Sequence, residues 1–330
     1  MWWDSRSDTF CFKTPASLHS FLEGNAVPTK RQLLSLLMSI YDPLGLIAGF
    51  LFFLKVILQE VWRAGVDWDQ EIHLVQYEKW RSWIKCLAEL EKISIPRCYR
   101  QRVDLNENNL QLHIFVDAGA DGFAAVAYFR YEQDGIIEVA LVGGKTRVAP
   151  IKYTSVPRLE LQAAVLGTRL AHAIKTAHRQ QIHSTRFWTD SKDVICWLRS
   201  DHRRYSTIVA HWVGEILEET DIHERQWIPT QLNVADEATK WSKLNAHLTA
   251  SQWFQGPKFL ASPEDSWSFK PCPHSSSEEE QKKPSIYTQR LNLIDSQIGS
   301  GCYDRSGTFA ASCTTFDILM IAIQAHYPLG

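Results

Sequence analysis

Four acidic residues stand where apolar segments of the sequence meet polar loops: Asp117, Glu160, Asp190 and Asp236. Carboxylates gathered at one place repel one another unless cations lie among them. Magnesium prefers carboxylate oxygen, keeps several waters and commonly uses a substrate phosphate to complete its coordination. Two such ions about 3.5–4 Å apart can stabilise both the attacking and the leaving oxygen of a phosphoryl displacement. An acid set without Cys or His partners therefore favours metal-assisted phosphoryl transfer.

Each of these carboxylates also has an ordinary structural interpretation. A single Asp at the end of a strand is common in turns, and Glu160 near a helix start interacts favourably with the helix dipole. Asp190 and Asp236 can cap the helices that follow them. The chemical interpretation depends on all four acids occurring together.

The elements expected around the acids form an α/β domain. Three alternating apolar runs, near 112–116, 123–130 and 136–142, are separated by Asp-Gly pairs that favour tight hairpins. Five further elements are expected: a helix over 158–178, a strand over 185–189, helices over 193–198 and 208–219, and a strand over 224–228, before a final helix. This order predicts a mixed five-stranded sheet flanked by helices. The first and fourth strands can lie side by side in it, which brings Asp117 next to Asp190 with Glu160 facing them.

The segment before this domain is expected to be mostly α-helical. Apolar residues recur at helical spacing over 30–62, with a break at Asp42-Pro43, and again over 72–90. The apolar run 44–58 is too short to span a bilayer and contains Lys55, so it is expected to be a buried helix. Core packing is a sufficient explanation of the Trp and Leu residues here.

These patterns divide the chain into four parts. They are a helical region at 1–100, the α/β domain at 101–245, an extension at 246–270, and a linker or disordered segment with an unassigned tail at 271–330. Residues 271–283 are polar and charged and cannot bury a core.

Charge is unevenly distributed along the chain. The formal net charge of −2 by itself argues against a general nucleic-acid binder. Between residues 141 and 212, however, twelve Lys and Arg stand against four Asp and Glu, a net +8 that leaves −10 for the rest. Such a local excess predicts contact with phosphates, although individual cations can also merely solvate helix faces.

The cysteines and the first residues indicate the expected cellular setting. Seven Cys are scattered without a CxxC pair, which favours a reducing, intracellular location without structural zinc. Residues 1–6 lack a basic start followed by an apolar run, so secretion is not expected.

Four motifs resemble those of retroelement ribonuclease H: IFVDA at 114–118, PRLEL at 157–161, WTDS at 188–191 and NVAD at 233–236. More narrowly, KTRVAP at 145–150, the segment 200–206 and YDPLGL at 41–46 are similar to the BEL/Pao group of long-terminal-repeat retrotransposons. The resemblance covers about residues 1–260, including WFQGP at 253–257. It implies that residues 1–100 are the thumb and connecting helices of a reverse transcriptase.

The resemblance also implies an activity, a cofactor and partners. It implies cleavage of the RNA strand of RNA–DNA hybrids with two Mg²⁺ ions, for which Mn²⁺ can substitute, in a ribonuclease H-like fold. Asp117, Glu160, Asp190 and Asp236 would be the metal ligands, with Asp117 bridging both ions and Asp236 peripheral on a separate terminal helix. The partners would be the hybrid and the rest of the Pol polyprotein, namely the polymerase palm and the integrase, with no membrane. The expected location is a cytoplasmic virus-like particle.

Contacts with the nucleic acid are expected from residues near the acids. Lys145 and Arg147 precede the helix that carries Glu160, while His202, Arg203 and Arg204 interrupt two helices, so both groups can grip phosphates. Ser191 and Asn233 can support the ligands or contact phosphate, or can simply cap helices.

Three alternatives were weighed against this interpretation. The last motif lacks the Pro after Asn and the Arg-Gly pair of its relatives, which leaves open an inactive, truncated remnant acting at most as a nucleic-acid-binding or interaction module. An integrase or a Holliday-junction nuclease would carry its acids in a different order. A reverse transcriptase proper would need a Tyr-x-Asp-Asp motif, which the chain lacks.

Overall fold

A five-stranded sheet lies at the centre of the computed structural model, which describes residues 1–15, 18, 21, 26–99, 110–240, 251–267 and 280–281. Its strands are β4 (Leu110–Gly119), β5 (Gly122–Gln133), β6 (Ile136–Val148), β7 (Ser184–Thr189) and β8 (Arg225–Trp227). They lie in the order β6-β5-β4-β7-β8. The first two pairings along the chain are antiparallel, whereas β4–β7 and β7–β8 are parallel. The expected mixed sheet, with the first and fourth strands side by side, is confirmed.

Tight turns join the first three strands. Asp134 and Gly135 both have positive φ, 52° and 77°, the conformation that two-residue hairpins require and that Asp-Gly tolerates. Gly122 has a φ of 155°, and a Cβ there would lie 2.2 Å from the carbonyl oxygen of Arg147. Asp134-Gly135 therefore forms the predicted turn, whereas the first hairpin turns at Ala120-Asp121 and Gly122 is already the first residue of β5, paired with Gly119.

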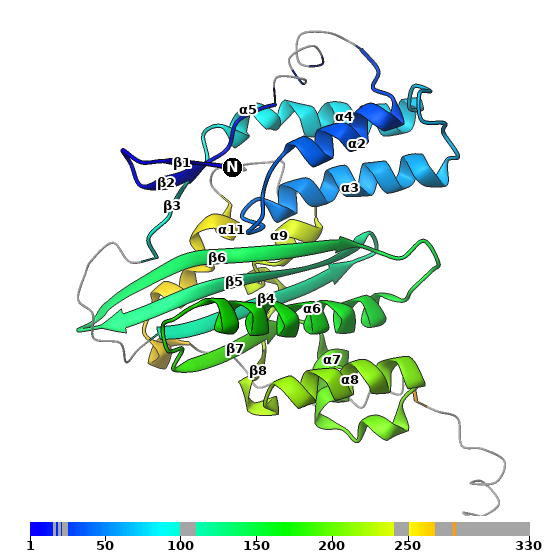
Figure 1. The fold of residues 1–330 in the computed structure, drawn as a ribbon. Coiled ribbons are helices and arrows are strands. Elements are labelled where there is room, and N and C mark those ends of the chain that lie inside the picture. Colours follow the sequence, from blue (N-terminus) through cyan, green and yellow to red (C-terminus); the bar gives the residue numbers. More distant parts are fainter. Residues whose placement is uncertain are drawn as a thin grey trace, which may run out of the picture. The chain divides into compact units, whose positions relative to one another are not determined.

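Three helices cover one face of the sheet and extend beyond it (Figure 1). They are α6 (Val156–Ala177), α7 (Lys192–Arg199) and α8 (Thr207–Glu219). Pro157 lies in the first turn of α6, where its missing N–H costs nothing. Leu159, Ala163 and Leu166 pack against β4 and β5, and Gly167 lets the helix approach closely, since a Cβ there would lie 2.6 Å from Val116.

The N-terminal helices cover the opposite face of the sheet (Figure 1). They are α2 (Lys30–Ser39), α3 (Ala48–Arg63), α4 (Leu74–Lys85) and the short α5 (Leu87–Leu90). The predicted break at Asp42-Pro43 occurs, but the next helix begins at Ala48 rather than at Leu44. The Asp42 carboxylate accepts hydrogen bonds from the N–H groups of Leu46 and Ile47, each at 2.9 Å, and so holds a turn before the helix.

Helix α3 and the sheet share one hydrophobic core. Phe50 and Phe52 of α3 belong to the same buried cluster as Phe115, Tyr128 and Trp188 of the sheet. Polar contacts tie the two parts as well: the Thr146 hydroxyl donates to the carbonyl of Ala48 at 3.2 Å. The boundary expected at residue 100 therefore lies between segments that pack directly on each other.

A small sheet in the N-terminal region was not predicted. Strands β1 (Trp2–Asp4), β2 (Thr9–Cys11) and β3 (Ser94–Pro96) pair antiparallel in that order. Three-residue strands are too short to show an alternating pattern, and β2 pairs with a strand far along the chain. The N-terminal region is helical with this small sheet added.

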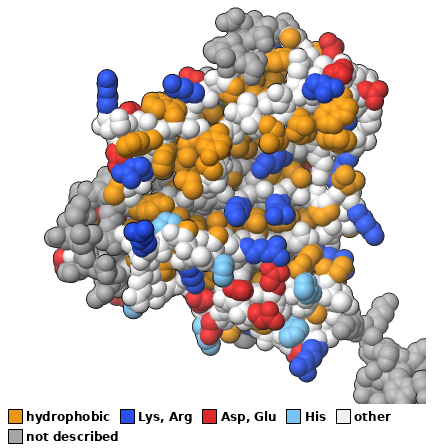
Figure 2. Space-filling view, viewed as in Figure 1, with side chains coloured by type: hydrophobic (Ala, Val, Ile, Leu, Met, Phe, Trp, Pro, Cys, Tyr) orange, Lys and Arg blue, Asp and Glu red, His pale blue; other side chains and the backbone are white. Residues whose placement is uncertain are grey.

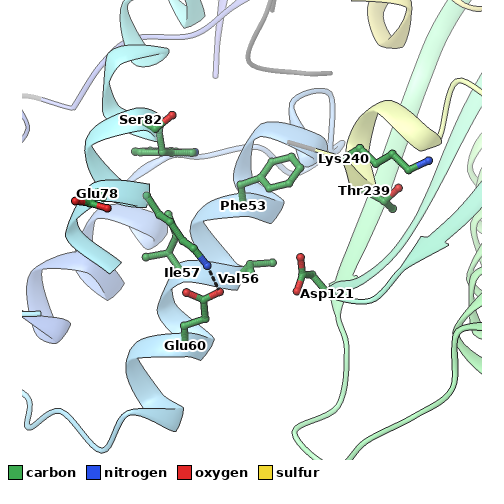
Figure 3. A pocket seen from close by; sticks show the side chains of 11 residues that line it. Phe53, Val56, Ile57, Glu60, Glu78, Ser82, Asp121, Thr239 and Lys240 are labelled. Atoms are coloured by element: carbon green, nitrogen blue, oxygen red, sulfur yellow. Dashed lines mark hydrogen bonds and ion pairs between the residues drawn. The ribbon is translucent and has the colours of Figure 1, made fainter. Parts of the chain in front are cut away.

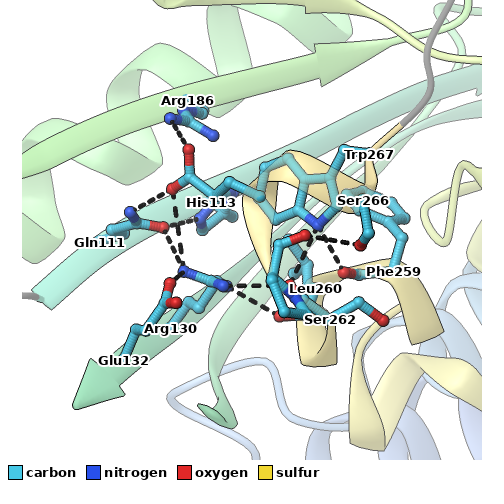
Figure 4. Close-up of polar contacts among 12 residues, drawn as sticks. Gln111, His113, Arg130, Glu132, Arg186, Phe259, Leu260, Ser262, Ser266 and Trp267 are labelled. Carbon is cyan, nitrogen blue, oxygen red and sulfur yellow. Dashed lines mark hydrogen bonds and ion pairs between the residues drawn. The ribbon is translucent and has the colours of Figure 1, made fainter. Parts of the chain in front are cut away.

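The extension after the domain packs back onto the sheet. It contains α11 (Gln252–Gln255) and two short 3-10 turns, at Lys258–Ala261 and Glu264–Ser266. The Arg130 guanidinium, fully buried, donates to the carbonyls of Leu260 and Ser262 at 2.8 and 3.0 Å and forms an ion pair with Glu132 (Figure 4). The Trp267 ring lies over Arg130 and Arg186, so the extension is fixed to the strands.

Two expectations concern other parts of the chain. The expected linker and tail at 271–330 fall outside the described residues, apart from Glu280 and Gln281. Among the helices that the structure describes, none is both long and apolar enough to cross a membrane.

Candidate active site

Three of the four acids meet at the end of the central strands. Asp117 lies near the end of β4 and Asp190 directly follows β7, and the parallel register pairs Phe115 with Trp188 two residues earlier. Asp236 opens α9 (Asp236–Thr239). The charges of Asp190 and Asp236 both raise the pKa of Asp117, so the three carboxylates lie near enough to interact electrostatically.

Asp117 is the most perturbed of the acids. Only 8% of the residue is exposed, and its pKa is raised to about 7, first by burial and then by the charges of Asp190 and Asp236. The Thr239 hydroxyl, which donates to Oδ2 of Asp117, and the Lys240 ammonium oppose this shift. A carboxyl with such a pKa is partly protonated near neutral pH, unless a bound cation displaces the proton.

Asn233 links two of the acid-bearing strands. Its Nδ2 donates to Oδ1 of Asp190 at 2.9 Å and to the carbonyl of Val116 at 3.0 Å. The residue is buried, so the amide fixes the orientation of Asp190 from behind. This geometry favours the supporting role that the sequence suggested for Asn233, while a phosphate contact stays a prediction.

Glu160 is held by the residue that follows Asp190. It lies in the first turns of α6, and its Oε2 accepts a hydrogen bond from the Ser191 hydroxyl. Ser191 also accepts from the N–H of Val194 at 3.2 Å and so caps α7. The buried Ser191 thus supports Glu160, and its predicted contact with nucleic acid remains a prediction.

Two residues that the sequence interpretation missed contact the acids directly. Lys240 forms an ion pair with Asp236, four residues earlier, and Thr239 donates to Asp117. Both lie in the part of the last motif that departs from the resemblance. The signal in the sequence that could have found them is their spacing of three and four residues from Asp236, because residues so spaced on a helix lie on one side of it.

Asp236 is buried in the structure. It is 1% exposed, the deepest of the four acids, because α9 is packed against β4, β5 and α3. The neighbouring Glu237 accepts hydrogen bonds from the Ser251 hydroxyl and the N–H of Trp253 and so anchors the extension. The expectation that Asp236 is a peripheral metal ligand on a separate terminal helix stays a prediction.

The donor chemistry suits a hard divalent cation, but the acids are paired otherwise in this structure. All four offer carboxylate oxygen, the ligand that Mg²⁺ prefers. Among the described residues, no three Asp, Glu, His or Cys side chains converge as ligands of one ion. The Lys240 ammonium supplies positive charge to the cluster instead, and a metal ion would have to replace it.

The predicted phosphate-contacting cations lie in two separate places. Lys145 and Arg147 are exposed on β6, an edge strand, and Arg203 and Arg204 are exposed in the turn between α7 and α8. His202, in the same turn, is half-buried. Figure 2 shows the face of the molecule that is seen in Figure 1. Cationic side chains lie across its middle, and more carboxylates lie towards α7 and α8.

A cavity of about 550 Å³ opens beside the acids (Figure 3). Thr239 and Lys240 line one side, and Phe53 and Ile57 of α3 line the other. The Lys79 ammonium and the Glu60 carboxylate pair at 2.6 Å within it. The N-terminal helices therefore form one wall of a cavity whose other wall holds Thr239 and Lys240, the residues that contact Asp117 and Asp236.

Residues 29–191 match the family model described as the Pao retrotransposon-like RNaseH-like domain. This stretch is a Pao-type retrotransposon RNase H region. The Pao-type match begins at the N-cap of α2 and ends at Ser191, so it includes the N-terminal helices, Asp117, Glu160 and Asp190, but not Asp236. The sheet order and the family match together confirm the expected ribonuclease H-like fold.

Two solved structures are similar to part of this chain. One is the N-terminal RNase H domain of rv2228c from Mycobacterium tuberculosis, fused to maltose-binding protein, with 14% identity, a TM-score of 0.29, and coverage of 43% of this chain and 98% of that chain. The other is RNase H1 from the halophilic archaeon Halobacterium salinarum, with 12% identity, a TM-score of 0.26, and coverage of 42% and 98%. No curated protein matches the chain.

Proposed function

We propose that this Pao-type region hydrolyses the RNA strand of RNA–DNA hybrids in a reaction that depends on divalent metal ions. The observation that carries the proposal is the meeting of Asp117 and Asp190 at adjacent strand ends, near Asp236 at the start of α9, with the pKa of Asp117 raised to about 7. Neighbouring carboxylates of this kind supply the oxygen ligands that a divalent cation prefers.

In this proposal Asp117, Glu160, Asp190 and Asp236 hold the metal, Mg²⁺ by preference and Mn²⁺ as a substitute. Bound metal would lower the pKa of a water and offset the charge that develops on the phosphate oxygens. The protein orients the ligands: Asn233 fixes Asp190, and Ser191 fixes Glu160. The Lys240 ammonium must move away from the Asp236 carboxylate before a metal ion can bind there.

Substrate recognition would depend on backbone phosphates and on the 2′-hydroxyl. Lys145, Arg147, His202, Arg203 and Arg204 are proposed to contact phosphates, and the 2′-hydroxyl distinguishes RNA from DNA in the wide minor groove of an A-like duplex. The context would be a Pol polyprotein with a polymerase palm and an integrase, inside a cytoplasmic virus-like particle.

One observation favours a second candidate, an inactive module that binds nucleic acid. The ammonium of Lys240 already compensates the charge of Asp236, which weakens the demand for a metal ion. In that case hybrid binding would persist without cleavage.

The two candidates separate in one assay. Purified protein is incubated with a hybrid labelled on each strand, with Mg²⁺, Mn²⁺ or chelator. We expect metal-dependent loss of the RNA strand alone, whereas binding without cleavage in either metal supports the inactive module.

Asp190→Asn is the matched variant for this assay. The amide keeps an oxygen for the hydrogen bond from Asn233 while removing one charge, so cleavage should be abolished and the melting temperature should hold or rise. Cleavage at the wild-type rate by a folded Asp190→Asn protein would remove Asp190 from the site.

A further inference from the structure

Glu280 and Gln281 lie beside the basic turn of the α/β domain. Gln281 forms an antiparallel bridge with Tyr205, and the N–H of Ser206 donates to the carbonyl of Glu280 at 2.8 Å. Ser206 is the N-cap of α8, and its side chain makes no hydrogen bond to the first turn of that helix. The hydroxyl of Ser206 is thus directed to a different partner.

That partner is the carboxylate of Glu280. Nε and Nη2 of Arg158 donate to Oε1 and Oε2 of Glu280 at 2.6 and 2.7 Å. The Ser206 hydroxyl donates to Oε2 at 2.9 Å. The side chains of Arg158 and Glu280 are 32% and 16% exposed, so this anion lies in a partly enclosed cradle. The same contacts lower the pKa of Glu280, which keeps it charged.

We propose that Arg158 and Ser206 form a binding site for a backbone phosphate of the RNA–DNA hybrid, and that Glu280 occupies it as an intramolecular competitor. The identity of the ligand rests on the proposed function. A guanidinium binds carboxylate and phosphate oxygens in the same paired geometry. When Glu280 departs, the hydroxyl and the N–H of Ser206, at the positive end of α8, both become available to a phosphate oxygen.

The position of the site fits a phosphate other than the one that reacts. Arg158 precedes Glu160 by two residues on α6, and positions two apart on a helix point about 200° from each other. Arg158 therefore faces α8 while Glu160 faces Ser191. The exposed Arg203 and Arg204 lie three and two residues before Ser206, so one strand could contact this turn and the Arg158 site together.

A second ion pair, which joins α6 to α8, provides a matched control. Arg169 of α6 binds Glu215 of α8 in the same paired geometry, at 2.6 and 2.9 Å. Glu215 belongs to a helix of the domain itself. Glu280, by contrast, ends the sequence run Ser-Ser-Ser-Glu-Glu-Glu at 275–280. Such a polar, acidic run does not build a core, and its carboxylates can compete with nucleic acid for cationic side chains.

The test measures affinity of the full-length protein for a short labelled hybrid by fluorescence anisotropy, in chelator so that no cleavage occurs, over a range of salt. Glu280→Gln should bind at least about threefold more tightly than wild type. Arg158→Gln should bind more weakly and lower the salt-dependence slope by about 1. Adding Glu280→Gln to Arg158→Gln should then bring no further gain. Ser206→Ala keeps the guanidinium of Arg158 and should also weaken binding of the hybrid. It serves in place of Arg158→Gln if the Arg158→Gln protein does not fold.

Glu215→Gln makes the same change in net charge and should leave the affinity unchanged. The site is overturned if Glu280→Gln and Glu215→Gln bind alike, because net charge alone then explains the gain, or if no variant binds the hybrid. A Glu280→Gln protein with a lower melting temperature and unaltered affinity would show that the contact only stabilises the fold. The expected affinities combined with absence of cleavage in metal would overturn the proposed function and leave the phosphate site standing.

Discussion

The raised pKa of Asp117 makes a prediction about stability and pH. Its pKa in the folded protein, about 7, lies above the ordinary value of 3.8. Between these values the metal-free folded state binds more protons than the unfolded state. Its free energy of unfolding therefore falls as pH rises from about 4 to 7, by on the order of 2–4 kcal/mol from this residue.

Asp117→Asn should abolish this dependence and stabilise the metal-free protein at pH 8. Urea denaturation in chelator at pH 5 and pH 8 measures both effects. Asp121→Asn, an exposed residue at the turn after β4, is the control and should behave as wild type. An equal loss of stability with pH in the Asp117→Asn protein would show that another group titrates.

Lys240 is expected to compete with metal. Replacing it by Met removes a charge that acts on Asp236, Asp117 and Asp190, so Mn²⁺ should bind several-fold more tightly, measured by calorimetry at pH 8. That pH lies above the pKa of Asp117, so proton competition is small. Lys85→Met, on a distant helix end, controls for net charge. Weaker Mn²⁺ binding in Lys240→Met would mean that the ammonium organises the ligands instead.

At the scale of elements, the YDPLGL segment is the joint between the N-terminal helices and the sheet. Gly45 has a φ of 71°, and a Cβ there would lie 1.8 Å from the carbonyl oxygen of Gly144 in β6. The N–H of Gly144 donates to the carbonyl of Leu44 at 3.1 Å. Two backbones therefore meet without side chains between them, which explains glycine at both positions.

Gly45→Ala should destabilise the protein by more than about 2 kcal/mol, because the positive φ and the backbone clash act together. Gly135→Ala isolates the first effect, since Gly135 has a φ of 77° with open space around its Cβ position, and it should cost only about 1 kcal/mol. Chemical denaturation of both variants gives the difference. Equal losses would indicate that the joint yields to accommodate the methyl group.

The sequence predicted the elements with local signals and missed those built from distant contacts. Alternation and Asp-Gly turns were enough for β4 to β6, and helical spacing was enough for α6. The roles of Thr239 and Lys240 depend on how α9 folds back to β4, which no local pattern reveals. The contact of α3 with the sheet had a signal in the sequence, because residues 48–54 include no polar side chain. All of them are buried in the structure, as expected for a helix packed between two layers.

At the scale of the whole molecule, residues 1–281 form one compact unit. The boundary expected at residue 100 stays a prediction, and it can be tested with a fragment of residues 101–330. Removing α3 would expose the cluster that contains Phe115, Tyr128 and Trp188. We expect this fragment to aggregate or to bind a hydrophobic dye strongly, because a large apolar face would meet water.

The control for this truncation is a fragment of residues 1–281, which keeps both sides of the core and should bind little dye and melt cooperatively. A fragment of residues 101–330 that is monomeric, cooperative and free of dye binding would show that the α/β domain folds alone. Size-exclusion chromatography, dye fluorescence and calorimetry make the comparison.

The joint between Gly45 and Gly144 also limits how related retrotransposons can recombine within this region. A crossover between two related copies that fell between α3 and β4 would combine a helical layer from one parent with a sheet from the other. Three contacts would then have to fit between residues from different parents. They are the close approach of Gly45 to Gly144, the packing of the aromatic side chains of α3, and the hydrogen bond that the Trp253 indole donates to the carbonyl of Leu46 at 2.8 Å. Viable chimeras should therefore inherit residues 41–63, 143–146 and 251–257 from one parent, and the spacing of surviving breakpoints would record that constraint.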